Sequence, residues 1–355
     1  PVVIRKLLLA YRELARAVKA QHAKAGSIVA LDVHTGEVLA MANYPAFNPN
    51  QRASMNNEVI RNRVLVDAFE PGSTLKPFVV AVAMETGRIR PNTLVETAGG
   101  KLKIGKAVIH DVRDKGNLTV SQVIQASSNV GAAKIALLLP PKTFWEMLNR
   151  SGFGTETGIG FPGEASGRLR AYDTWRPIEQ ATMSYGHGIS ASLMQLARAY
   201  TLFATDGELK PVTLLKRDMP AVGQKVISRE TAQSVREMLE LAVQPEGTGN
   251  NARISGYRIA GKTGTAHKRL KDQKGYAKDR YISSFVGFAP ASDPRVIIAV
   301  MIDEPSSGNY YGGTVAAPVF SRVMEGALRI LNVPFDEPLG NLVISPVPAK
   351  LEDKG

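Results

Sequence analysis

The chain has 355 residues, of which 44% are hydrophobic and 21% charged, so it can bury a sizeable core and is not a disordered polyelectrolyte. Lys and Arg number 44 against 32 Asp and Glu, a formal net charge of +12 that would suit an anionic partner. The basic residues are spread along the chain without a nucleic-acid motif, so we expect a solvated basic surface and no nucleic-acid partner. The absence of cysteine excludes disulfides, thiolate zinc sites and a cysteine nucleophile.

Apolar runs in this sequence are short. The run 78–84, among the longest, is far below the roughly 20 residues needed to cross a bilayer. The chain opens at Pro1 without the pattern of a signal peptide, so we expect it to be a piece of a longer protein. Any membrane anchor is then expected outside this chain.

Hydrophobic periodicity predicts strands near both ends of the chain and helices between them. The predicted elements are, in chain order, a helix over 6–19, strands over 27–33 and 37–43, helices over 78–86, 119–138, 193–205 and 229–243, strands over 258–267, 282–288 and 296–302, and a helix over 315–331. This order favours an α/β (α+β) fold, in which distant segments build an antiparallel sheet covered by helices. Four prolines beyond Leu331 predict an extended tail over 333–355.

A serine and a lysine stand three residues apart at Ser73 and Lys76. On a helical turn these positions share one face, so a lysine whose pKa has been lowered can take the serine proton and make the hydroxyl a nucleophile. Ser-x-x-Lys by itself is weak, because it also occurs at ordinary exposed helix starts. Pro77 disfavours a helical conformation at Lys76, so we expect a distorted first turn.

The second candidate is the run Ser127, Ser128 and Asn129, inside the predicted helix 119–138. Residues two apart on a helix do not share a face, so Ser127 and Asn129 can serve one site only if the helix breaks there. We therefore predict a break between two helices at this run. A polar face on one continuous helix is the alternative.

The third candidate is Lys262-Thr263-Gly264-Thr265, at the end of a predicted strand. The period of two puts Thr263 and Thr265 on one side, where two hydroxyls can hold a carboxylate, while Lys262 leaves from the other. Gly264 is expected to let an extended substrate approach the strand edge. The upstream glycine spacing of a Walker A loop is missing, which disfavours a nucleotide site.

Ser-x-x-Lys, Ser-x-Asn and Lys-Thr-Gly, in this order, resemble the joint signature of penicillin-binding proteins and class A β-lactamases, with Ser128 at the usual aspartate position. Further segments resemble class B penicillin-binding proteins, and within them the septal, cell-division transpeptidase. These segments are 47–50, 69–77, 161–164, 175–186, 193–200, 247–249 and 311–313.

The resemblance implies one β-lactamase-like transpeptidase domain over 1–332, with a five-stranded antiparallel sheet and a mostly helical second lobe. It implies a periplasmic peptidoglycan D,D-transpeptidase, held at the bacterial inner membrane by an anchor and pedestal that this chain lacks. The substrate would be a stem peptide ending in D-Ala-D-Ala, which β-lactams mimic. A membrane-embedded glycan polymerase and other division proteins would be its partners, and no cofactor or metal is implied.

The resemblance also implies roles for single residues. Ser73 would be the nucleophile, Lys76 its base and Ser127 a proton relay, while Asn129 would orient Lys76 and the donor peptide. The implied roles of the strand are that Lys262 assists Ser127, that Thr263 and Thr265 hold the terminal carboxylate, and that the N–H groups of Ser73 and Thr265 form an oxyanion hole. Two lysines in one cleft are expected to depress each other's pKa.

Several alternatives remain open from the sequence. A β-lactamase would share the three motifs, but no carboxylate has a context that marks it as the base for deacylation, and Glu164 is expected to be structural. A D,D-carboxypeptidase would differ only in using water as acceptor, and a penicillin sensor or silent scaffold would keep the fold. The basic stretch 268–280 is expected to be either a mobile loop at the cleft rim or a structured hairpin.

Overall fold

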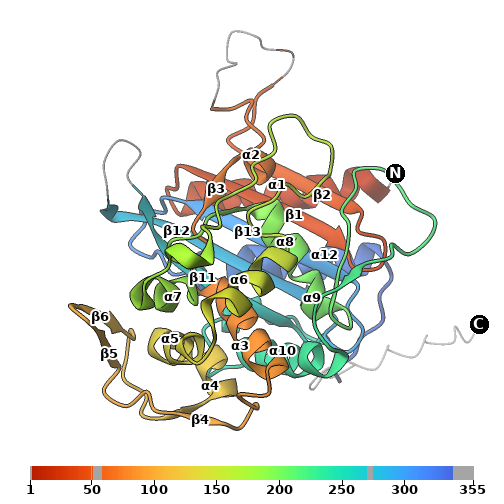
Figure 1. The fold of residues 1–355 in the computed structure, drawn as a ribbon. Coiled ribbons are helices and arrows are strands. Elements are labelled where there is room, and N and C mark those ends of the chain that lie inside the picture. The colour runs from red at the N-terminus through yellow and green to blue at the C-terminus, as the bar shows by residue number, and fades with distance from the viewer. Residues whose placement is uncertain (1, 49, 51–57, 270–274, 339–355) are drawn as a thin grey trace, which may run out of the picture.

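The computed structural model describes residues 2–48, 50, 58–269 and 275–338. Its centre is one five-stranded antiparallel sheet, in the order β11-β12-β13-β1-β2, as predicted. The strands are β1 (Ala25–Asp32), β2 (Val38–Tyr44), β11 (Ala260–Arg269), β12 (Tyr276–Ala289) and β13 (Val296–Asp303). Segments from both ends of the chain thus lie side by side, and β11 forms one edge of the sheet (Figure 1).

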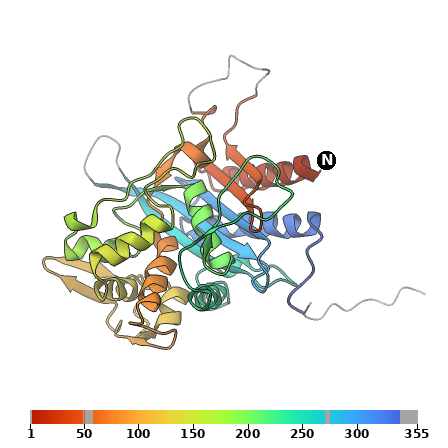
Figure 2. The ribbon, with the colours of Figure 1, turned by 45° about the vertical axis from the view of Figure 1, so that its right-hand side comes forward.

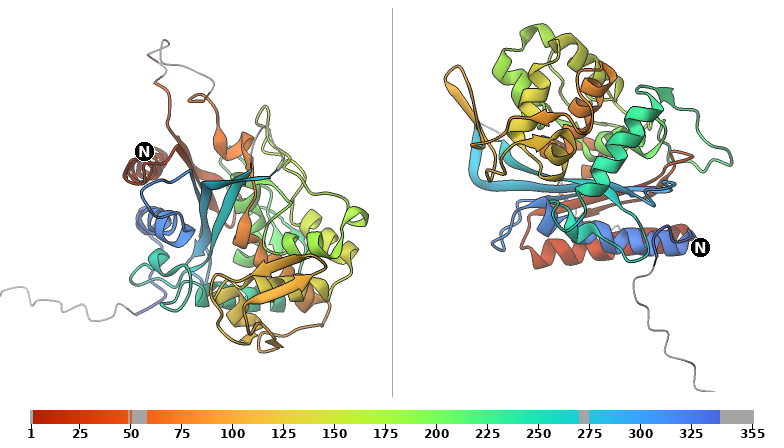
Figure 3. Two further views of the ribbon diagram at one scale, coloured as in Figure 1. Left: turned by 90° about the vertical axis from the view of Figure 1, so that its left-hand side faces the viewer. Right: turned by 90° about the horizontal axis from the view of Figure 1, so that it is seen from below.

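Helices cover the two faces of the sheet unequally (Figure 3). One face carries the long helices α1 (Val2–Ala20) and α12 (Ala317–Ile330), which pack on the sheet in a smaller apolar core. The other face carries the larger core and the helical lobe. No helix among the described residues is long and apolar enough to span a membrane.

The helical lobe fills the middle of the chain, and Figure 2 shows it as a separate layer in front of the sheet. Its helices are α3 (Lys76–Glu85), α4 (Val120–Gln125), α5 (Asn129–Leu137), α6 (Pro141–Arg150), α7 (Pro177–Met183), α8 (Leu193–Ala199), α9 (Thr201–Ala204) and α10 (Arg229–Leu241). The single helix predicted over 193–205 is therefore divided at Tyr200. The Tyr200 hydroxyl is buried and donates a 2.8 Å hydrogen bond to the Thr74 carbonyl, which ties this division to the segment that carries Ser73.

Short elements join these layers. They are α2 (Arg63–Val66), α11 (Gly312–Val315) and the paired strands β3 (Ala68–Phe69) with β8 (Ala191–Ser192), β4 (Leu94–Val95) with β7 (Leu118–Thr119), β5 (Lys101–Ile104) with β6 (Ala107–His110), and β9 (Glu208–Leu209) with β10 (Gln224–Lys225). The helix predicted over 315–331 is also divided in two. It begins at Gly312 with α11 and continues from Ala317 as α12.

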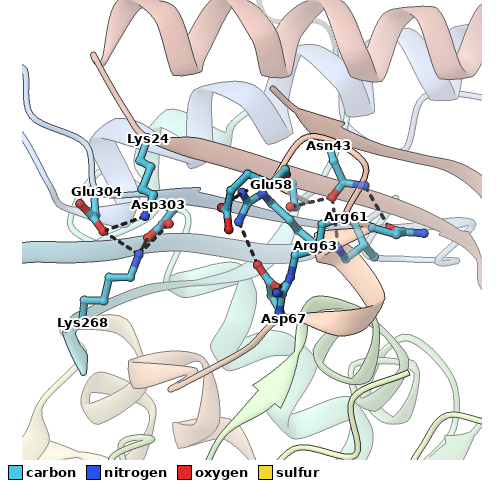
Figure 4. Close-up of polar contacts among 12 residues, drawn as sticks. Lys24, Asn43, Glu58, Arg61, Arg63, Asp67, Lys268, Asp303 and Glu304 are labelled. Carbon is cyan, nitrogen blue, oxygen red and sulfur yellow. Dashed lines mark hydrogen bonds and ion pairs between the residues drawn. The ribbon is translucent and has the colours of Figure 1, made fainter. Parts of the chain in front are cut away.

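Ion pairs hold the sheet end nearest the basic stretch 268–280 (Figure 4). Lys268 lies between Asp303 at 2.6 Å and Glu304 at 2.7 Å. Arg63, which is almost fully buried, pairs with Glu58 at 2.8 Å and with Asp67 at 3.1 Å. Strand pairing continues as far as Arg269 and Tyr276, so both flanks of the stretch form a hairpin, whereas 270–274 lie outside the described residues.

The predicted C-terminal tail is described only at its start. The Tyr257 hydroxyl donates to the Val333 carbonyl at 2.7 Å, and the Asp336 carboxylate accepts from the Arg258 backbone N–H at 2.8 Å. These bonds hold 333–338 against the domain. Residues 339–355, and with them most of the predicted tail, lie outside the described residues.

Candidate active site

A cleft of about 740 Å³ lies between the helical lobe and the edge strand β11. Ser73, Ser127 and Asn129 line it from the helical side, and Thr263 and Thr265 line it from the strand. The structure thus brings together the three motifs, which are separated in the sequence by more than 50 and more than 130 residues.

Ser73 lies on a 3₁₀ turn, Gly72–Leu75, that leads into α3. The distorted first turn is therefore as predicted, but Lys76 itself is helical, with φ −55° and ψ −37°, although Pro77 disfavours this conformation. Pro77 occupies the first turn of α3, where its missing N–H removes no helical hydrogen bond. Gly72 has φ +60°, and a Cβ there would lie 3.2 Å from the Thr265 carbonyl oxygen, so the turn packs directly on β11.

The predicted helix break at Ser127 is confirmed. Ser127 has φ +59°, a left-handed conformation that is uncommon for a residue with a side chain, and it separates α4 from α5. Ser128 caps α5, because its Oγ accepts from the Gly131 N–H at 2.8 Å. The break places Ser127 and Asn129 in one site, which a continuous helix would prevent.

The Lys76 amine lies at the centre of the polar contacts. It is 2.8 Å from Asn129 Oδ1 and 3.1 Å from Ser127 Oγ, and it also donates to the Ser127 carbonyl. Among the described residues Ser73 Oγ has no hydrogen-bond partner, although Ser73 lines the same cleft. Lys76 is therefore held by the α4–α5 junction, one helical turn from the serine.

Lys262 reaches the same hydroxyl from the strand. Its Nζ donates to Ser127 Oγ at 3.0 Å and lies 3.3 Å from Thr263 Oγ1. Both lysine side chains are fully buried, and Ser127 Oγ lies between their two amines at the wall of the cleft. A hydroxyl in this position can pass a proton in either direction, since it both donates and accepts hydrogen bonds.

Burial lowers the pKa of both lysines, because a charged amine loses its hydration in the protein interior. The pKa of Lys76 lies well below 10.5, first because of desolvation and second because of the positive charge of Lys262. Desolvation lowers the pKa of Lys262 to about 7. The predicted direction is thus correct, but burial is a larger cause than the repulsion between the two lysines.

On β11, successive side chains point to opposite sides of the strand, and this alternation decides which of them face the cleft. Thr263 and Thr265 both line the cleft, as the period of two predicts. The expectation for Gly264 needs correction: it does not line the cleft, and a Cβ there would lie 2.3 Å from Ser284 Oγ and 2.8 Å from the Pro71 carbonyl oxygen. Glycine is needed at 264 because the serine turn and β12 pack against it.

Asp111 is a site residue that the sequence analysis missed. It follows β6, and its carboxylate accepts from Ser128 Oγ at 2.6 Å, from the Val130 N–H at 3.0 Å and from the Asn129 N–H. A carboxylate at the start of α5 satisfies N–H groups that have no partner within the helix. No local pattern marks Asp111, because the helix start that it caps comes 18 residues later in the chain.

Thr248 and a group of tyrosines were also missed. Thr248 Oγ1 lies 2.9 Å from Thr263 Oγ1 and extends the row of hydroxyls along the cleft. The rings of Tyr281 and Tyr310 stack with centroids 3.9 Å apart, and Tyr311 lines the same wall. The segment 247–249, which carries the resemblance, was the only available signal for Thr248.

Other large side chains near the site either pack in the protein or line the cleft without a partner among the three motifs. Trp175 is buried in the core, and Glu164 accepts from the Thr157 N–H at 2.8 Å as a structural carboxylate. His187 lines the cleft, and burial with the nearby positive charges of His267 and Lys76 lowers its pKa to about 4, so it is neutral at pH 7. Tyr185 both packs against α5 and lines the cleft.

These features define a class of protein, an active-site-serine acyl transferase with a lysine pair. A family model described as the penicillin binding protein transpeptidase domain matches residues 26–325. The apo transpeptidase domain of penicillin-binding protein 3 from Burkholderia pseudomallei is 49% identical, with a TM-score of 0.87, over 94% of this chain and 97% of that chain.

Two curated relatives point the same way. A Neisseria flavescens protein named probable peptidoglycan D,D-transpeptidase PenA is 44% identical over 341 residues, 96% of this chain and 84% of the relative. The Escherichia coli K12 peptidoglycan D,D-transpeptidase FtsI is 43% identical over 325 residues, 92% of this chain and 55% of the relative. The chain therefore belongs to the penicillin-binding protein transpeptidase family. This confirms the predicted class B likeness, the fold and the enzyme class, a serine D,D-transpeptidase.

The chain spans only part of most relatives. It covers 55% to 61% of the Neisseria meningitidis, Pseudomonas aeruginosa and E. coli proteins, and 84% of the N. flavescens protein. The similarity therefore concerns this domain and not the remaining parts of those longer proteins.

Proposed function

We propose that this chain cross-links peptidoglycan stem peptides through an acyl-enzyme formed on Ser73. The observation that carries the proposal is the convergence of two buried amines on Ser127 Oγ, at 3.1 Å from Lys76 and 3.0 Å from Lys262, beside the serine turn. Such a site can hold one lysine neutral as a base while the other retains a proton.

Acylation begins when neutral Lys76 takes the Ser73 proton. Ser73 Oγ then attacks the carbonyl carbon of the penultimate D-Ala in a peptide ending in D-Ala-D-Ala, and a tetrahedral intermediate forms. When the peptide bond breaks, Ser127 gives its proton to the departing D-Ala amine and is reprotonated from a lysine. Asn129 holds Lys76 in position through its 2.8 Å contact.

The developing oxyanion is stabilised by the backbone N–H groups of Ser73 and Thr265. The close packing of Gly72 on the Thr265 backbone supports this pairing, because it brings the two segments together. Thr263 and Thr265 bind the terminal carboxylate beside Lys262. The Gly264 backbone lies between them, but its role in binding is limited by the packing described above.

In the second half of the reaction, the amine of a neighbouring stem peptide attacks the acyl-serine carbonyl. Lys76 takes a proton from this amine, the ester bond to Ser73 breaks, and the serine recovers its proton. The product is a new peptide cross-link. β-Lactams inhibit by forming the same ester, from which no leaving group departs.

The cellular setting follows from the relatives. The E. coli relative is named FtsI, which supports septal wall synthesis at the periplasmic face of the inner membrane. A membrane anchor outside this chain, a membrane-embedded glycan polymerase and other division proteins complete the proposed assembly.

Intact-mass measurement after incubation with benzylpenicillin tests the proposal. We expect a long-lived adduct of one antibiotic molecule, absent in Ser73→Ala. Rapid turnover of the antibiotic would instead identify a β-lactamase, and absence of both adduct and turnover would identify a silent domain.

A peptide donor separates the remaining rival. With a D-Ala-D-Ala peptide and an amine acceptor, we expect the amide product to form at the expense of hydrolysis. Hydrolysis that is unaffected by the amine would mean a D,D-carboxypeptidase.

A further inference from the structure

Five exposed cations surround the β5–β6 hairpin and the turn that follows it. This set, called the basic ribbon here, consists of Lys101, Lys103, Lys106, Arg113 and Lys115. Within the described part of the chain, none of the five makes an ion pair or a side-chain hydrogen bond.

The two neighbouring carboxylates, Asp111 and Asp114, offset only part of the five positive charges of the ribbon. Asp111 is engaged with the start of α5, and Asp114 accepts from the Gly99 and Gly116 N–H groups at 2.9 Å each. The ribbon therefore carries a local excess of positive charge.

The hairpin has one apolar and one basic face. Leu102, Ile104 and Ile109 pack against the helical lobe, in a small core that includes Tyr185. Lys101 and Lys103 alternate with them and are exposed. In Figure 1 the hairpin projects from the lobe beside α5, which leaves its basic face open to solvent.

This basic face continues into the active-site cleft. Lys101 pairs in register with His110, whose carbonyl accepts from Asn129 Nδ2 at 3.1 Å. Three residues later Arg113 lines the cleft, followed by Lys115. The pKa of Tyr311 is raised, first by its hydrogen bond with Tyr310, and the positive charge of Arg113 opposes this rise, which places Arg113 within electrostatic range of the opposite wall.

The cleft thus leads from the reacting serine to a row of cations that have no protein partner. In the proposed mechanism, Thr263 and Thr265 on β11 bind one carboxylate of the substrate, the one at the C-terminal end of the donor peptide. A row of uncompensated charges beyond it favours a ligand with further negative charges along its length.

We propose that the basic ribbon binds the free carboxylates that a peptidoglycan peptide carries upstream of its reacting end. The inference rests on the proposed transpeptidase function and deepens it by assigning a subsite for an acidic peptide. This peptide is either the remainder of the donor or the acceptor strand, because both carry the same chemistry.

The test uses the double variant Lys101→Gln/Lys103→Gln, whose two changes lie outside the cleft. Two donor peptides are compared, one with free upstream carboxylates and a twin in which these are amidated. Losing two exposed charge pairs is expected to lower kcat/KM by roughly fivefold to tenfold for the carboxylate donor. The amidated twin should change by less than twofold.

Two measurements distinguish binding of the donor peptide from binding of the acceptor peptide. If the ribbon binds the donor, the loss appears in hydrolysis without any acceptor. If it binds the acceptor, hydrolysis is unchanged and the loss appears only in amide formation with a carboxylate-bearing acceptor. In the wild type, the affected rate should also fall as salt rises from 50 to 500 mM, through screening of exposed charges, and this dependence should weaken in the variant.

A matched control removes the same charge from the other side of the sheet, in Arg5→Gln/Arg16→Gln on α1. It should leave both peptides unaffected. Equal losses for the carboxylate and amidated peptides in every arm, or no loss in any arm, would overturn the proposal. Failure of the proposed function would be seen separately, as a wild-type protein that benzylpenicillin does not acylate.

Discussion

The two walls of the cleft are built in different ways. The strand wall places Thr263 and Thr265 by the simple alternation of β11. The helical wall depends on irregular backbone, namely a 3₁₀ turn at Ser73 and a left-handed residue at Ser127. Irregular backbone persists only where surrounding contacts hold it, so the helical wall should be sensitive to residues outside the cleft. The strand wall should be sensitive mainly to its own side chains.

The largest expected effect is loss of the base in Lys76→Met. Acylation by benzylpenicillin should slow by at least about 1000-fold, because general-base catalysis supplies about 10² to 10⁴ in rate and the second amine of the site, Lys262 Nζ, is bonded to Ser127 Oγ. Folding should be retained, because methionine is apolar and of similar length in a fully buried position. Stopped-flow or mass-based acylation rates check this, with Lys142→Met on the exposed face of α6 as control. A loss below tenfold would remove Lys76 from the role of base.

The second prediction concerns Asp111, which lies outside the three motifs and holds the start of α5 in place. Asp111→Asn should slow acylation by about tenfold to 100-fold, the equivalent of about 1 to 3 kcal/mol, because an amide cannot accept from all the groups that the carboxylate holds at α5. The melting temperature should fall as well. The control is Asp114→Asn, in which an amide likewise replaces a carboxylate that accepts from two N–H groups, those of Gly99 and Gly116, outside α5. If both variants acylate alike, Asp111 does not support the helical wall.

Thr263→Val tests the strand wall and should have a smaller effect. Removing one neutral hydroxyl contact to the carboxylate is expected to weaken initial binding of benzylpenicillin by about tenfold at most. The acylation rate constant and the melting temperature should change little, because β11 keeps its pairing with β12. Separate determination of binding and acylation constants decides the matter. A loss confined to the acylation step would contradict the contrast between the two walls.

The smallest effect is a pH dependence of stability. The pKa of Lys262 is about 7 in the folded protein against an ordinary value of 10.5, so between these limits the unfolded chain holds a proton that the folded chain lacks. The free energy of unfolding should therefore rise with pH, by about 1 kcal/mol between pH 7 and pH 8 from this group. Urea unfolding of the wild type against Lys262→Met isolates this contribution. If the free energies of unfolding of the two proteins differed by the same amount at pH 7 and at pH 8, the pKa of Lys262 would not be lowered in the folded protein.

Much of the fold could be read from local patterns. Four of the five main strands and most helices appear within a few residues of their predicted bounds, because alternation and helical spacing record which side chains are buried. The exception is β12, which begins at Tyr276 and not at the predicted residue 282. The break at Ser127 could also be inferred, since Ser127 and Asn129 cannot share a face of one helix. The division at Tyr200 could not, because it accompanies a hydrogen bond to Thr74, 126 residues away.

The sequence by itself determined the family, the three motifs and the chemistry that their side chains can perform. These properties depend on the residue types and on short spacings along the chain, and both can be read from the sequence alone. Only the tertiary structure decided that Asp111 caps α5, that Gly264 faces the serine turn and that the two amines at Ser127 are fully buried. The reason is physical: burial, pKa and close packing depend on segments that are distant in the chain, and no local pattern specifies which of them will come together.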